Sequence, residues 1–186
     1  MRLKGLTPYS FNERSHCKKL PISSSLGAVG ELLPLCLAHA FSLAIIGSDP
    51  EIRKLVNIPF NQTLTSAEGY AKGRIAEAET GASATFVLIC QDAVIGCCSL
   101  HSFSRARDEA EVAFWLDRSY WGLGWGTEMC RALVTIARQE RSLSVLIARC
   151  LLSNGRAISV LQKCAFRPAN LPGKDIRLFT LRLESK

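Results

Sequence analysis

The middle of the chain carries an apolar pattern with the two-residue period that is typical of β-strands. Residues 84–91 and 94–103 form two such runs, and residues 109–117 form a third in which apolar and other positions alternate. The first two runs are separated only by a short turn at Asp92 and the residue after it. So short a connection requires antiparallel neighbours, so the sequence predicts an antiparallel meander of three strands.

Towards the C-terminus the pattern changes to alternating helices and strands. Residues 126–139 place apolar side chains at helical spacing and predict an amphipathic helix. Residues 145–152 are almost entirely apolar, as expected for a strand that is buried on both faces. A helix over residues 155–164 and a final strand over residues 176–183 complete the prediction.

The part of the chain before the meander is predicted to be helical. Residues 25–46 suggest one or two helical pieces, interrupted near Pro34. Asp49 is followed by a proline, which indicates an N-cap and a short helix to about residue 56. Thr65 and Glu68 have capping-box spacing, which predicts a helix that ends near Gly81. Residues 1–24 are basic and irregular, and no element is predicted there.

These elements describe one α/β domain over residues 25–186, with a mixed, mostly antiparallel sheet flanked by helices. A chain of 186 residues with 48% apolar residues can bury a full core without metals or disulfides. No repeat or low-complexity tract suggests a second domain.

The eight cysteines form no CxxC pair and no zinc-like spacing with histidine, so no metal site is predicted. Thiols without a disulfide framework favour a reducing, cytoplasmic location. The one membrane candidate, residues 24–47, contains Glu31 and Pro34 and lacks the ~20 consecutive apolar residues that a spanning helix needs. We therefore predict a buried helix there and no membrane partner.

A strand, a glycine-rich turn and a helix follow each other at residues 110–128. Gly122, Gly124 and Gly126 allow unusual backbone angles, and consecutive N–H groups at a helix N-terminus bind anions. The turn is therefore predicted to bind a phosphate or pyrophosphate. It contains no lysine, unlike a P-loop, and its third glycine comes one residue too early for a dinucleotide fingerprint.

The segment EVAFWLDRSYWGLGWGTEMCRALVTIA resembles motif A of the GNAT acetyltransferases, particularly those that modify ribosomal-protein N-termini, and NGRAISVLQKCAF resembles the motif that follows. The resemblance covers about residues 38–183. It implies a GNAT fold and acetyl-CoA as co-substrate. By the same resemblance, backbone groups of one strand edge bind the pantetheine arm, and N–H groups of the turn bind the pyrophosphate. An asparagine caps the next helix and touches the cofactor, and an arginine reaches the CoA phosphates. In this sequence these cofactor-binding positions are Phe114, Trp115, Leu116, Leu123, Gly124, Trp125, Gly126, Thr127, Asn154 and Arg156, with Arg131 as an alternative cation.

Two positions depart from the family pattern. The usual glycine before the final phenylalanine is Ala165, and the tyrosine that many relatives use as general acid is Leu161. Protonation of the leaving thiolate then falls to Ser159, to water or to no group.

Acetyl transfer requires a base for the ammonium proton and a donor for the oxyanion. We expect Glu111 to be the base, acting directly or through water; the alternative role for Glu111 is a structural or amine-binding carboxylate. His101 on the neighbouring strand is the alternative base. The resemblance suggests the backbone N–H of Leu116 as the oxyanion donor.

The acceptor is expected to be a primary amine: a protein N-terminus, an amino acid or a small polyamine-like amine. Residues 22–130 carry a net charge of −5 and residues 131–186 a net charge of +8, which suits a cationic acceptor and an anionic cofactor. A non-catalytic acyl-CoA-binding domain is the main alternative. A nucleic-acid-binding protein is disfavoured because the basic residues form no aromatic-interleaved patch. Monomer and homodimer both stay open.

Overall fold

The computed structural model describes residues 20–104, 108–139, 143–169 and 175–183. The elements in chain order are β1 (Leu20–Ser23), β2 (Val29–Pro34), η1 (Leu37–His39), α2 (Ala40–Ile46), α3 (Pro50–Leu55), α4 (Leu64–Glu79), β3 (Ala84–Cys90), β4 (Ala93–Ser104), β5 (Glu109–Leu116), η2 (Arg118–Tyr120), α5 (Trp125–Gln139), β6 (Val145–Leu151), α6 (Gly155–Lys163), β7 (Arg167–Ala169) and β8 (Ile176–Arg182). None of the helices within these ranges is long and apolar enough to cross a membrane.

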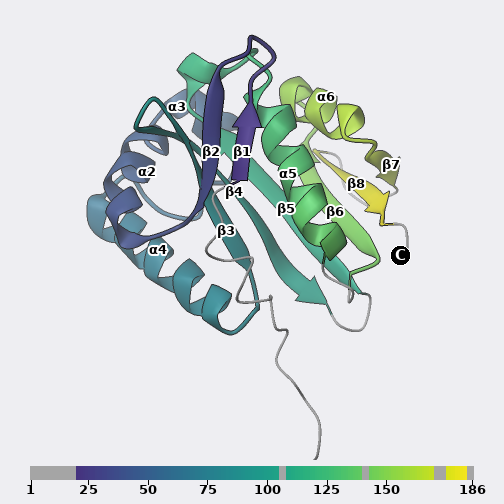
Figure 1. Cartoon of the computed structure of the whole chain (residues 1–186), viewed down its shortest axis with the longest axis horizontal. Helices are drawn as coiled ribbons and strands as arrows, with labels where there is room; N and C mark the ends of the chain where they lie inside the picture. The colour runs from purple at the N-terminus through teal and green to yellow at the C-terminus, as the bar shows by residue number, and fades with distance from the viewer. Residues whose placement is uncertain (1–19, 105–107, 140–142, 170–174, 184–186) are drawn as a thin grey trace, which may run out of the picture.

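All the strands join one eight-stranded sheet in the order β1-β2-β3-β4-β5-β6-β8-β7 (Figure 1). Every neighbouring pair is antiparallel except β5 and β6. The parallel pair is short: its register covers only Glu109–Glu111 on β5 and Val145–Ile147 on β6. Within the described ranges, the rest of β5 has no strand partner on that side. The single-domain, mixed and mostly antiparallel α/β fold expected from the sequence is confirmed.

Helices cover both faces of the sheet, and each face has its own core (Figure 1). Because side chains alternate across a strand, β5 contributes Val112 to one core and Trp115 to the other. The first core lies under α5 and α6 and includes Leu133 and Phe179, both fully buried. The second lies under α2, α3 and α4 and includes Leu43.

Both helix N-caps predicted from the sequence are present in the structure, but one lies two residues earlier than predicted. Asp49 accepts from the N–H of Glu51 at 2.7 Å and begins α3 as predicted. The N-cap of α4 is Thr63, whose hydroxyl accepts from the Ser66 N–H at 3.2 Å, and not Thr65. The β3–β4 turn lies at Gln91 and Asp92, which both have positive φ angles.

The prediction of helix over the first part of residues 25–46 was wrong. The residues from Leu20 to Pro34 form the β1–β2 hairpin, and helix begins only at η1 and α2. Leu32 lies fully buried opposite Leu88 of β3. An apolar run this short is compatible with either element, and its pairing with a strand more than 50 residues away decided the outcome.

Candidate functional site

The unpaired part of β5 opens a gap in the sheet towards β6. The Asp117 N–H donates to the Ile95 carbonyl on β4 at 2.8 Å. Backbone groups alternate in direction along a strand, so the N–H groups of Phe114 and Leu116 point the other way, towards β6. Pairing with β6 ends at Glu111, so these two N–H groups face the gap and are available to a ligand.

The glycine turn after β5 has the backbone geometry that an anion-binding loop needs. Gly122 and Gly124 have φ angles of +79° and +89°, in the left-handed region that favours glycine. The first turn of α5 follows directly, so N–H groups converge at its N-terminus. The Thr127 N–H, expected to bind phosphate, instead donates to the Gly124 carbonyl at 3.0 Å.

The tip of the β1–β2 hairpin holds this turn in place. The N–H and the hydroxyl of Ser25 both donate to the Leu123 carbonyl, at 3.0 and 2.7 Å. A Cβ at Gly124 would lie 2.7–2.8 Å from atoms of Ser25. Glycine is therefore required at this position by the hairpin as well as by its φ angle. Sequence reasoning missed Ser25, because no local motif marks a contact across 98 residues.

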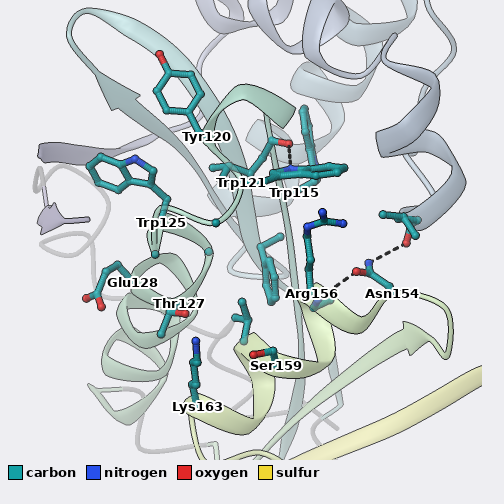
Figure 2. Close-up of a pocket in the computed structure, with 18 of the residues that line it drawn as sticks. Trp115, Tyr120, Trp121, Trp125, Thr127, Glu128, Asn154, Arg156, Ser159 and Lys163 are labelled. Carbon is teal, nitrogen blue, oxygen red and sulfur yellow. Dashed lines mark hydrogen bonds between the residues drawn. The ribbon is translucent and has the colours of Figure 1, made fainter. Parts of the chain in front are cut away.

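The gap and the turn border a cavity of about 570 Å³. Its walls come from α3, the end of β5, the glycine turn, the start of α5 and one side of α6 (Figure 2). We call it the first cavity. Nine of the ten expected cofactor-binding residues line it; Leu123 does not, since its carbonyl is bound by Ser25.

Two of the expected residues are held by other parts of the chain. Asn154 caps α6 by accepting from the Ala157 N–H at 3.1 Å, and it donates to the Leu55 carbonyl at 3.2 Å. It therefore ties α3 to α6 at the cavity wall. The Arg156 guanidinium stacks over the Trp121 ring, 4.9 Å from its centroid. The Trp121 indole N–H in turn donates to the Leu116 carbonyl at 2.9 Å (Figure 2).

A second cavity, of about 610 Å³, lies between α4 and the face of β4 and β5. Trp115 and Val56 line both cavities, so the two meet at these residues. The floor of the second cavity includes Ser99, which is 6% exposed and whose hydroxyl has no hydrogen-bond partner within the described ranges. A molecule in this cavity would approach the gap from the side opposite α5.

The two candidate bases are neighbours across the β4–β5 ladder, where His101 is paired with Glu111. The Glu111 carboxylate, 15% exposed, accepts from the Arg149 guanidinium. Burial raises the pKa of Glu111, and the Arg149 charge opposes that shift. Burial, reinforced by the charges of Arg74 and Arg149, lowers the pKa of His101 to about 4. His101 is therefore neutral near pH 7, and its Nδ1 lies 2.9 Å from the Ser102 hydroxyl.

The positions that depart from the GNAT pattern have clear structural roles. Leu161 is fully buried in the first core and carries no group that could donate a proton. Ser159 lines the first cavity. Ala165 has a φ angle of +66° just after α6, a conformation that normally favours glycine.

Within the described residues no cluster of three or more His, Cys, Asp or Glu side chains could hold a metal ion. The seven cysteines in those ranges are free thiols, and Cys17 lies outside them.

Comparison with known proteins adds to this geometry. Residues 31–167 match the model of the acetyltransferase (GNAT) domain. The chain is 25% identical over 126 residues to the uncharacterized N-acetyltransferase p20 of Bacillus licheniformis, covering 67% of this chain and 71% of that protein. RimL, a ribosomal L7/L12 α-N-protein acetyltransferase solved with coenzyme A, has a TM-score of 0.79 at 16% identity, covering 91% of this chain and all of RimL. Mycobacterium smegmatis RimJ, solved with a CoA disulfide, has a TM-score of 0.77 at 18% identity, covering 88% and 86% of the two chains.

Proposed function

The chain belongs to the GNAT family and is an acetyl-CoA-dependent acetyltransferase, and we propose that its acceptor is the α-amine at the N-terminus of a protein. The observation that carries the proposal is the pair of cavities that meet at Trp115, at the gap between β5 and β6. One cavity suits the cofactor and the other suits the acceptor. Small primary amines are the alternative acceptors. The resemblance to proteins that acetylate ribosomal α-amines favours the protein N-terminus.

In this proposal acetyl-CoA occupies the first cavity. The N–H groups of Gly124, Trp125 and Gly126 bind the pyrophosphate, with the Thr127 hydroxyl at the cavity wall. The pantetheine arm then lies along Phe114, Trp115 and Leu116, in the place of a sheet neighbour. Its amides satisfy backbone groups that β6 leaves unpaired.

The acceptor amine enters through the second cavity and attacks the thioester carbonyl in the gap. The carbonyl oxygen becomes negative in the tetrahedral intermediate and needs a fixed donor. We propose that the Leu116 N–H, or the Phe114 N–H deeper along the strand, supplies it, because both groups point into the gap. Collapse of the intermediate breaks the C–S bond, and the thiolate leaves towards Ser159. The proton that the attacking nitrogen must still lose reaches the thiolate through water, or by a relay in which the Ser159 hydroxyl gives up one proton and accepts another.

Glu111 is proposed as the base that takes the ammonium proton. It lies at the point where β5 and β6 separate, and the Arg149 charge opposes the rise that burial causes in its pKa. His101, with a pKa of about 4, accepts a proton too weakly near pH 7 to compete. Because the carboxylate is ion-paired, a bridging water is the simplest path for the proton.

The acceptor class is tested with initial rates of CoA release, measured with acetyl-CoA and matched peptides. One peptide has a free α-amine and no lysine, a second has a blocked N-terminus and one lysine, and polyamines form the third group. We expect turnover with the first peptide. Turnover with polyamines alone would overturn the protein N-terminus as acceptor. CoA binding without turnover on any amine would instead support a non-catalytic binding domain.

The described thiols are all free, which supports our proposal that the protein works in a reducing compartment such as the cytoplasm.

A further inference from the structure

One side of α6 lines the first cavity. Arg156, Ser159 and Lys163 line it at spacings of three and four residues, which puts them on one face of the helix. Lys163 follows Arg156 by seven positions, which corresponds to about 10 Å along a helix axis. Two cations therefore stand at opposite ends of this face. Figure 2 shows Lys163 near Thr127 and Ser159, and Arg156 towards Asn154.

The charges around the cavity are not equally available to a ligand. The Arg131 guanidinium is bound by the Glu128 carboxylate at 2.6 Å. Arg156 stacks on Trp121, beside the end of β5. Lys163 is exposed, and no carboxylate pairs with it in the part of the chain that the structure describes. Among the cations that line the first cavity, only the Lys163 ammonium has no partner within the described residues.

The position of Lys163 matches one part of the cofactor. The glycine turn binds the pyrophosphate, and the pantetheine arm extends from there towards Trp115 and Asn154. The adenosine end must then extend the other way, past Thr127, where Lys163 lies. Apart from the pyrophosphate, the only anionic group of CoA is the phosphate monoester on the ribose 3′ oxygen, which carries close to two negative charges at pH 7.

We propose that Lys163 binds this 3′-phosphate and makes the enzyme discriminate CoA from dephospho-CoA, which lacks it. Arg156 lies towards Asn154, on the pantetheine side of the glycine turn, so the two cations have separate roles. This inference rests on the proposed cofactor position in the first cavity. It assigns a contact to a residue that neither the glycine turn nor the strand edge identifies.

Calorimetry of CoA and dephospho-CoA binding to the full chain tests the proposal without any acceptor. For the unmodified protein we expect CoA to bind roughly five- to tenfold more tightly at low salt, the range for one partly exposed charge-assisted contact. Lys163→Gln should remove most of this difference by weakening CoA binding alone. Lys163→Arg should retain it. Lys72→Gln, a charge removal on α4 across the sheet, should leave both affinities unchanged.

The outcomes separate the inference from the function it rests on. If neither ligand binds the unmodified protein, the proposed cofactor site is wrong. If both bind equally, the site stands and the 3′-phosphate is not recognised. If Lys163→Gln weakens both ligands by the same factor, or keeps the discrimination, Lys163 is not the residue that binds the 3′-phosphate.

Discussion

Replacing Ala165 with glycine should stabilise the protein. The residue follows the end of α6, where the Ala165 N–H donates to the Gln162 carbonyl and the Phe166 N–H to the Leu161 carbonyl, both at 3.0 Å. This Schellman geometry puts Ala165 at φ +66°. A left-handed conformation costs a non-glycine residue about 1–2 kcal/mol. Glycine loses more conformational entropy than alanine on folding, which offsets roughly 0.5–1 kcal/mol of that stabilisation. The net gain is therefore about 0.5–1 kcal/mol.

Urea and thermal unfolding of the purified variants measure this gain. For a chain of this size it corresponds to a rise in Tm of roughly 1–4 °C. Ala76→Gly is the matched control, because Ala76 is an equally exposed alanine inside α4. That change should destabilise the protein by about 0.8–1 kcal/mol. If Ala165→Gly lowers stability as Ala76→Gly does, the residue is not held in the left-handed conformation.

Four further predictions concern the site and its ionisable groups. Glu111→Gln should lower kcat/KM by roughly 10²–10⁴-fold, leave acetyl-CoA affinity unchanged and alter the acidic limb of the pH–rate profile; a rise in KM with an unaltered profile would leave Glu111 only a binding role. Gly124→Val should abolish acetyl-CoA binding in calorimetry. Gly122→Val, at a similar φ angle but with no atom within 4 Å of the added Cβ, should lower the acetyl-CoA affinity less, and equal losses of affinity would contradict the Ser25 contact. Because the pKa of His101 is lowered to about 4 in the folded state, its contribution to the free energy of unfolding is complete above pH 6.5 and should be lost as the pH falls towards 4. In urea unfolding, His101→Gln should weaken this dependence of stability on acid pH. Intact mass under non-reducing conditions should show eight free thiols, and a deficit of hydrogen masses would reveal a disulfide.

Much of the fold follows from local pattern. The strands β3, β4 and β5 alternate with period two and are joined by short turns, so their order and pairing could be predicted. The hairpin of β1 and β2 could not. Its packing depends on Gly30, where an added Cβ would lie 3.0 Å from the Trp125 ring, a contact between residues far apart in the chain.

The functional site also has some features that the sequence predicts and others that it does not. The glycine turn is a contiguous motif, and it was recognised with the strand before it. The contact of Ser25 with the Leu123 carbonyl and the Arg149–Glu111 ion pair are tertiary contacts, so no spacing in the sequence indicates them. The sequence can identify candidate charged side chains, but their ion pairs and hydrogen bonds in the folded protein determine which of them can bind a ligand.

The crystal structure of the complex with acetyl-CoA tests the central claim most directly. The account predicts the pyrophosphate on the N–H groups of the glycine turn and the pantetheine arm in the gap between β5 and β6. The thioester carbonyl oxygen should lie within hydrogen-bonding distance of the Leu116 or Phe114 N–H, facing the second cavity. An acyl group outside this gap, or one that Trp115 separates from the second cavity, would contradict the account.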